Sequence, residues 1–140
     1  MRRRARALTD ADFERLLDFR DGLRRFLRWS EDEARRVGLT GPQHQLLLAI
    51  RGHGHPPSIG DVSNHLLLKH HSAVELIDRA ERAGLIEREA DATDHRVVRL
   101  FLTRAGEAKL VSLADTHFEE LARLRPRLEQ LWQRLPETTT

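Results

Sequence analysis

Hydrophobic residues recur every three or four positions along most of the chain, and this spacing is typical of amphipathic helices. In the first such stretch Thr9 and Asp12 form a capping box, so a helix begins there, and Gly38 supplies the stop. The sequence therefore predicts a helix over residues 9–38. A second capping signal predicts a helix near residues 42–52, with a proline in its first turn, where a missing amide costs nothing.

Ser58 and Asp61 repeat the capping signal and predict a short third helix that ends near Leu67. A turn at residues 68–70 then leads into a fourth helix, which we expect at about residues 71–83. The apolar positions that would face the core from this helix are Val74, Ile77 and Ala80.

The pattern then changes to that of β-strands. Residues 85–89 and 97–102 have the character of strands, and the polar stretch 90–96 between them is rich in turn residues. The sequence therefore predicts an antiparallel hairpin, the wing, over residues 86–102.

A last helical region is predicted over residues 103–135, with Thr103 as its cap and residues 136–140 as a tail. Pro126 interrupts this region, because it lacks an amide and clashes with the carbonyl of Ala122, so we expect a kink or a break. The apolar positions follow the four-and-three spacing of a coiled coil, at Leu110, Ala114, His117, Leu121, Leu124, Leu128, Leu131 and Leu135.

Long amphipathic helices at both ends of a 140-residue chain must bury their apolar faces. Packing within the chain is one solution, and a homodimer is the solution that we favour. The residues expected in the dimer interface are Leu16, Phe19, Leu23, Leu121, Leu124, Leu128, Leu131 and Leu135. The predicted fold is mostly α-helical with a small β-hairpin wing. In this single domain, a winged helix-turn-helix at residues 40–102 stands between N- and C-terminal dimerisation helices.

The predicted elements follow the order of a winged helix-turn-helix: helix, short helix, turn, helix and hairpin. This fold places the second helix of its helix-turn-helix in the major groove and its hairpin in the adjacent minor groove. Double-stranded DNA is therefore the expected partner. Arg96, near the hairpin tip, is the predicted minor-groove residue, and Asp94 can hold its guanidinium by a bidentate contact. The residues expected to contact DNA are Ser58, Lys69, His70, His71, Ser72, Glu75, Asp94 and Arg96.

These residues also have simpler interpretations. Lys69 and Ser72 can serve only to cap a helix, and Asp94 with Arg96 can form a surface ion pair worth under about 1 kcal/mol. Residues 58–102 hold six Lys or Arg against eight Asp or Glu, so DNA binding must depend on a few well-placed groups. This balance favours the main alternative, a winged-helix module that binds another protein and not DNA.

The chain resembles the multiple-antibiotic-resistance regulator (MarR) family of winged-helix transcription factors from about Arg20 to Leu135. The segments that carry the resemblance are residues 59–66, residues 74–86 and, above all, Asp94-His95-Arg96 followed by Leu-Phe-Leu-Thr-Arg-Ala-Gly at 100–106. The resemblance implies a homodimeric transcription regulator, commonly a repressor, that binds a pseudo-palindromic operator and in some members a small-molecule effector. Glu75 departs from the family, whose members often carry a basic or hydroxyl residue there.

The composition excludes several kinds of site and a membrane-spanning protein. The 140 residues include no cysteine, which excludes disulfides and thiolate metal sites, and 24 Lys and Arg against 22 Asp and Glu leave a net charge of +2. The longest apolar run, residues 46–50, is far shorter than the roughly 20 residues of a membrane span, so we expect a cytoplasmic protein with no membrane partner.

Eight histidines raise a further alternative, a metal-sensing regulator. Zinc requires three or four converging ligands, but no His-x-x-x-His pair occurs, and adjacent histidines such as His70 and His71 point apart. The sequence therefore predicts neither a metal site nor a cofactor. It also lacks a glycine-rich phosphate loop, a nucleophile elbow and a catalytic carboxylate pair, so we do not expect an enzyme.

Overall fold

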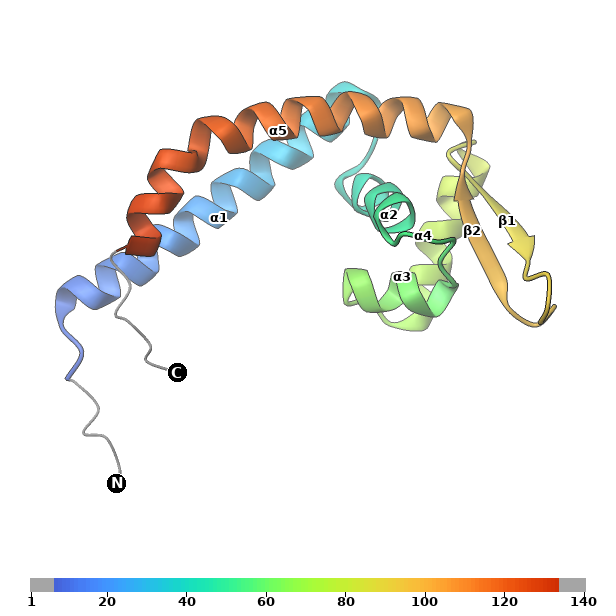
Figure 1. Cartoon of the computed structure of the whole chain (residues 1–140), viewed down its shortest axis with the longest axis horizontal. Helices are drawn as coiled ribbons and strands as arrows, with labels where there is room; N and C mark the ends of the chain where they lie inside the picture. The colour runs from blue at the N-terminus through green and yellow to red at the C-terminus, as the bar shows by residue number, and fades with distance from the viewer. Residues whose placement is uncertain (1–6, 134–140) are drawn as a thin grey trace. The chain divides into compact units, whose positions relative to one another are not determined.

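The computed structural model describes residues 7–133, which form five helices and one two-stranded sheet (Figure 1). In chain order the elements are α1 (Asp10–Arg36), α2 (Gly41–Gly52), α3 (Ile59–Leu66), α4 (His70–Arg82), β1 (Ile86–Ala90), β2 (Val98–Leu102) and α5 (Arg104–Gln133). This is the mostly helical fold with a hairpin wing that the sequence predicts. The described residues divide into two compact units, one of residues 31–116 and one of residues 7–30 with 117–133.

The unit of residues 31–116 contains the hydrophobic core. Helices α2, α3 and α4 contact one another and the hairpin, whose strands pair antiparallel from Ile86 opposite Leu102 to Ala90 opposite Val98. The core consists of Ala34, Leu39, Leu46, Leu47, Ile50, Val62, Ile77, Ala80, Leu85, Ile86, Leu100, Leu110 and Leu113. One predicted core position is wrong: Val74 is only half-buried, and Ala73, which shares the four-and-three stripe of Ile77 and Ala80, is the fully buried residue of that turn.

Capping boxes begin α2 and α3, as predicted. At α2 the Thr40 hydroxyl accepts the Gln43 amide at 3.2 Å, and the Gln43 side chain accepts the Thr40 amide at 3.0 Å. Helix α3 ends at Leu66, and its C-cap residue is Leu67, whose φ of 53° lies in the left-handed region and whose side chain is 91% exposed. This conformation crowds the Cβ of an L-residue, so Leu67 holds strain at the turn between α3 and α4.

The junction between the hairpin and α5 depends on Thr103 and Gly106. The Thr103 hydroxyl accepts the Gly106 amide at 3.1 Å and donates to the carbonyl oxygen of Gly84 at 2.6 Å, while the Thr103 amide donates to the Leu85 carbonyl oxygen at 3.0 Å. A side chain at Gly106 would overlap that same oxygen. The Leu-Thr-x-x-Gly pattern of the sequence is therefore a helix cap combined with a close backbone contact.

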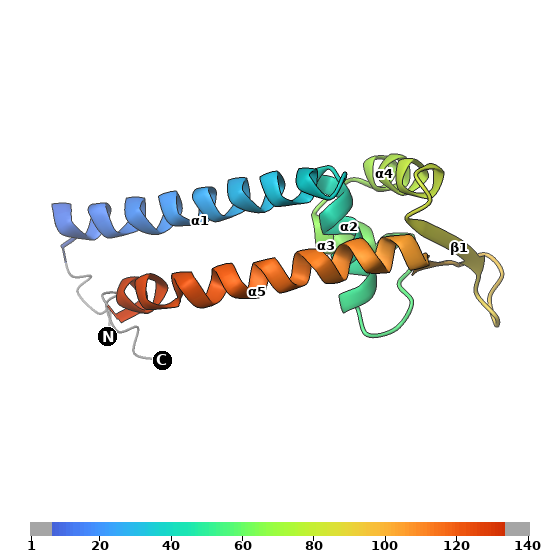
Figure 2. The same cartoon turned by 90° about the horizontal axis from the view of Figure 1, so that it is seen from above.

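In the other unit, parts of α1 and α5 lie antiparallel. Phe19 meets Trp132 with ring centroids 6.0 Å apart, and at the other end Ser30 Oγ lies 2.7 Å from His117 Nε2. We expected a kink or a break at Pro126. The helix does not break, since α5 continues through Pro126 to Gln133, and the ribbon changes direction towards the C-terminal end of α5 (Figure 2). The predicted interface residue Leu135 and the tail lie outside the described residues.

This helix pair is poor in buried apolar surface. Among residues 7–133, every buried hydrophobic side chain lies between Ala34 and Leu113, in the other unit. The exposed large hydrophobic residues of the pair are Phe13, Leu16, Leu17, Leu23, Leu27, Phe118, Leu121 and Trp132. A separate observation is that no helix within residues 7–133 has the length and apolar content needed to cross a membrane.

Candidate nucleic-acid interface

The first turn of α4 leaves backbone amides available. Lys69 is the N-cap residue, and no side chain of the described residues caps this helix start, whereas α2 and α3 are both capped. The first helical hydrogen bond runs from the Ala73 amide to the Lys69 carbonyl oxygen at 3.0 Å. The free amides and the helix dipole together favour an anion at this end. Lys69 is therefore not the side-chain cap of its helix that the simpler interpretation allowed.

The exposed face of α4 carries most of the predicted contact residues. Lys69, His70, His71 and Glu75 are exposed, and Ser72 is half-buried. Arg79 is also exposed, one turn beyond Glu75, and sequence reasoning missed it. The signal was present, because positions 71, 75 and 79 repeat at four-residue spacing and so share one face of the helix.

Ser58 serves α3 as its cap. Its hydroxyl accepts the Asp61 amide at 3.1 Å, and the Asp61 carboxylate accepts the Ser58 amide at 2.9 Å. That amide hydrogen bond lowers the pKa of Asp61 below its usual range, with smaller contributions from the Ser58 hydroxyl, His53 and Arg99. Ser58 is thus committed to a capping box, unlike the other predicted contact residues.

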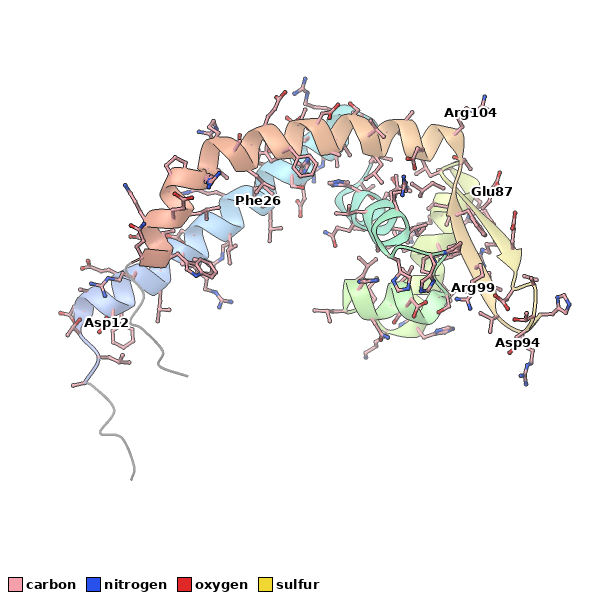
Figure 3. All side chains as sticks on the ribbon, viewed as in Figure 1. Asp12, Phe26, Glu87, Asp94, Arg99 and Arg104 are labelled. Carbon is pink, nitrogen blue, oxygen red and sulfur yellow. The ribbon has the colours of Figure 1, made fainter. Side chains whose placement is uncertain are left out.

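The wing presents Arg96 to solvent, with its side chain 91% exposed. The Asp94 carboxylate holds the guanidinium by two contacts, Nε to Oδ1 at 3.1 Å and Nη2 to Oδ2 at 3.3 Å, so the expected bidentate pair is confirmed. This pairing with Arg96 lowers the pKa of Asp94. Figure 3 shows Asp94 at the end of the hairpin opposite Glu87 and Arg104.

Asp91, which sequence reasoning missed, organises the wing loop. Its Oδ2 accepts the Thr93 amide at 3.1 Å, the Thr93 hydroxyl at 2.8 Å and the Asp94 amide at 2.9 Å. These bonds, led by the Asp94 amide, together with the Arg99 guanidinium, hold the pKa of Asp91 far below its usual range. The sequence signal was the Asp-x-Thr-Asp run, which is typical of an Asx turn.

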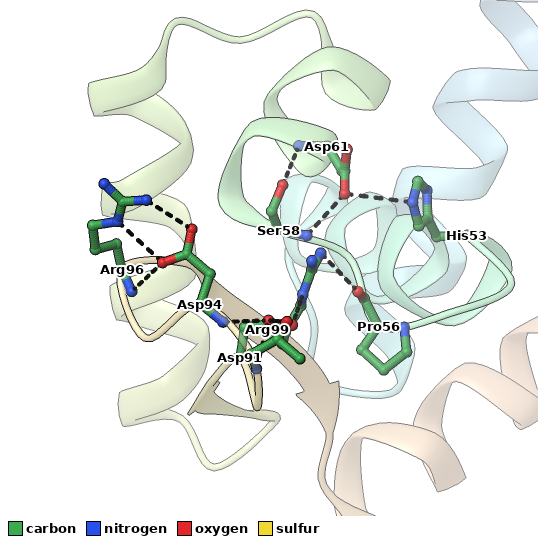
Figure 4. A network of polar contacts seen from close by, with 9 residues as sticks. His53, Pro56, Ser58, Asp61, Asp91, Asp94, Arg96 and Arg99 are labelled. Atoms are coloured by element: carbon green, nitrogen blue, oxygen red, sulfur yellow. Dashed lines mark hydrogen bonds and ion pairs between the residues drawn. The ribbon is translucent and has the colours of Figure 1, made fainter.

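Arg99, on β2, reaches from the wing loop to the segment that precedes α3 (Figure 4). Its Nε donates to Asp91 Oδ1 at 3.0 Å and its Nη1 to the Pro56 carbonyl oxygen at 3.4 Å. The backbones also meet here, because the Leu100 amide donates to the Pro57 carbonyl oxygen at 3.0 Å and Ser58 forms a β-bridge with Arg99.

Three histidines gather beside α3. His53 Nδ1 lies 2.8 Å from His65 Nε2, His53 Nε2 lies 3.5 Å from Asp61, and the rings of His53 and His55 have centroids 4.6 Å apart. The two ring nitrogens of His53 therefore face different partners, so His53, His65 and Asp61 do not converge on one point. Within residues 7–133 no group of three or more His, Asp or Glu side chains is arranged to hold a metal ion.

The predicted dimer residues gather around one cavity. A space of about 450 Å³ between α1 and α5 is lined by Phe26 and Trp29 and by Leu23, Leu121, Leu124, Leu128 and Leu131. Leu16 is exposed on α1, and Phe19 is half-buried against Trp132. The structure thus brings together five of the eight residues that the sequence assigns to the interface.

Comparison with known proteins agrees with the resemblance to the MarR family. Residues 37–97 match the sequence profile of the MarR family. The chain is 30% identical over 104 residues to an uncharacterised HTH-type transcriptional regulator, YsmB of Bacillus subtilis, and this match covers 71% of the chain and 70% of YsmB.

Solved structures agree in fold. AbsC, a MarR family transcriptional regulator of Streptomyces coelicolor, superposes with a TM-score of 0.72 at 21% identity, over 93% of this chain and all of AbsC. A mutant of S. aureus MepR bound to an oligodeoxyribonucleotide gives a TM-score of 0.64 at 20% identity, over 94% of this chain and 87% of MepR. At these identities the likeness establishes the fold alone.

Proposed function

The chain belongs to the MarR family of transcription regulators, which are not enzymes, and on this premise we propose that it binds specific sequences of double-stranded DNA in the cytoplasm. Helix α4 enters the major groove by its first turn, and Arg96 enters the adjacent minor groove. The observation that carries this proposal is the exposed Arg96 guanidinium, which Asp94 holds at the tip of the wing.

Helix α4 supplies the second contact. Its uncapped amides offer donors to a phosphate, and Lys69 adds a positive charge at the same place. His70, His71 and Ser72 follow within the first turn, where hydroxyl and imidazole groups can bond to base edges. Glu75 is an acceptor suited to the amino group of cytosine.

A homodimer is the proposed active form. The helix pair of residues 10–30 and 117–133 buries no hydrophobic side chain, yet it exposes eight large ones. Burying this surface against a second copy removes it from water, which is the main driving force of association. Two-fold symmetry then places two α4 helices in successive major grooves, so the operator is a pseudo-palindrome with half-sites about 10 bp apart.

Repression is the proposed outcome, since an occupied operator excludes polymerase from an overlapping promoter. MepR, which shares the fold, has been solved with bound oligodeoxyribonucleotide, and this supports DNA as the partner. A small-molecule effector would act by binding one dimer arrangement more tightly than another. The apolar cavity between α1 and α5 has a volume within the range of small-molecule sites.

Selection from a random pool of DNA duplexes tests the proposal. Purified protein should enrich a palindrome, and Arg96→Ala should weaken binding to the enriched duplex by about 1–3 kcal/mol. Arg104→Ala is the matched control, because it removes the same charge from an exposed site beyond the other end of β2, and it should have little effect. No enrichment at low salt would refute DNA recognition and favour the protein-binding alternative.

A further inference from the structure

Arg99 lies on β2, within the wing, and its side chain joins the wing loop to the segment that precedes α3. One nitrogen donates to Asp91, which begins the wing loop, and another donates to the carbonyl oxygen of Pro56, just before the cap of α3. Both charged side chains are largely covered, at 30% exposed for Arg99 and 21% for Asp91. Neither is therefore a freely moving surface group.

Asp91 continues the connection towards the tip of the wing. The oxygen that does not face Arg99 accepts the amides of Thr93 and Asp94, and the Asp94 carboxylate holds the guanidinium of Arg96. An unbroken series of polar contacts thus runs from Pro56 through Arg99 and Asp91 to Arg96 (Figure 4).

We infer that Arg99 and Asp91 are positioning residues for DNA recognition, which fix Arg96 relative to the helix-turn-helix without contacting DNA. The inference rests on the proposed function. A two-stranded hairpin is marginally stable alone, so an external attachment is needed to hold its tip. A binding group must be held to within about 0.5 Å to contribute fully, and Arg99 supplies this restraint at the base of the wing loop.

Asp91→Asn is the decisive variant, because the loss of its charge and the loss of its contact with Arg99 predict opposite changes in DNA affinity. The change removes a negative charge near the DNA, so electrostatic attraction alone would tighten binding. The asparagine oxygen can still accept from the wing-loop amides, but its amide group no longer attracts Arg99. We expect binding to the selected duplex to weaken roughly fivefold. Equal or tighter binding would overturn the inference.

Arg99→Gln tests the same contact between Arg99 and Asp91 by changing its other partner. It should weaken binding roughly fivefold when Arg96 is present and less than about twofold in the Arg96→Ala background. A loss of the same size in both backgrounds would mean that Arg99 contacts DNA directly or acts only through stability, and would refute positioning. Arg51→Gln is the control, since Arg51 on α2 pairs with Glu107 at 3.0 Å and neither residue lies on the wing; its effect should add to that of Arg96→Ala.

A measurement without DNA separates this inference from the proposed function. In Arg99→Gln, hydrogen exchange of the Thr93 and Asp94 amides should accelerate, whereas exchange in the core of α4 stays as in the wild type. Unchanged exchange in the wing loop would overturn the inference even if the wild-type protein binds DNA. If exchange accelerates in Arg99→Gln but the wild-type protein enriches no duplex, the proposed function is refuted and the attachment of the wing is established.

Discussion

Gly106→Ala places a methyl group where the structure has no room. Gly106 is the third residue of α5, and an added Cβ would overlap the carbonyl oxygen of Leu85 and lie 3.1 Å from its carbonyl carbon. Leu85 cannot easily retreat, because it is 4% exposed and its oxygen accepts the Thr103 amide at 3.0 Å. The next residue, Ile86, is 1% exposed and begins β1. Any shift would therefore disturb the core and the hairpin together.

The expected change in the free energy of unfolding follows from three effects. Overpacking a well-packed site costs about 1–3 kcal/mol. Weakening the hydrogen bond between Thr103 and Leu85 costs about 1 kcal/mol more. The higher helix propensity of alanine returns about 1 kcal/mol. We therefore expect Gly106→Ala to destabilise the protein by about 2 kcal/mol.

Unfolding in guanidinium chloride, at one fixed protein concentration because association shifts the midpoint, measures this change. Gly60→Ala is the matched control: Gly60 is the second residue of α3, and its Cβ would lie 3.7 Å from Ser58 Oγ, an ordinary contact. This control should be neutral or stabilised by up to about 1 kcal/mol. If Gly106→Ala unfolds at the same denaturant concentration as the wild type or higher, the contact with Leu85 does not limit this position.

Leu67→Gly should stabilise the protein by about 0.5–1 kcal/mol, because it relieves a left-handed conformation at a side chain that is 91% exposed; Leu67→Ala, which keeps the strain, should not. Since the pKa of Asp91 is lower in the folded protein than its ordinary value of 3.8, the stabilisation from its ionised form is complete above that value and is lost as the pH falls below it. The difference in stability between wild type and Asp91→Asn should therefore be constant near pH 6 and shrink below about pH 4, and a constant difference down to pH 2 would contradict this. Leu121→Glu should weaken the homodimer at least about tenfold in sedimentation equilibrium, whereas Leu48→Glu, at a similarly exposed leucine on α2, should not; equal effects would remove α5 from the interface.

The order of the helices and the hairpin could be predicted because each element has a local signal. The capping residues Thr9, Thr40 and Ser58 lie within a residue or two of the observed helix starts, since a cap depends only on the residues that follow it. Of the two outcomes predicted at Pro126, a kink or a break, the break does not occur, because α5 continues through this residue. A proline removes one hydrogen bond, and the remaining turns of a long helix can tolerate that loss at the cost of a bend.

The candidate site was predicted less completely, for a reason that lies in its contacts. Asp94 and Arg96 are two residues apart, so their pairing follows from the sequence alone. Arg99 and Pro56 are 43 residues apart, and only the position of the hairpin against the start of α3 brings them together. The contact between His53 and His65 likewise depends on how a loop folds back on α3. Long-range polar contacts of this kind have no periodic or spacing signal.

The acidic residues of the winged helix-turn-helix explain how a region with more acids than bases can still present positive groups. Asp61 is used within a helix cap, Asp91 within the wing loop, and Asp78 in a pair with Arg88. Each carboxylate is thus directed at a donor within the protein, where it fixes the backbone or a side chain. In the proposed function, DNA recognition depends on where a few cations and amides are held, and the carboxylates of Asp91 and Asp94 hold the wing loop and Arg96.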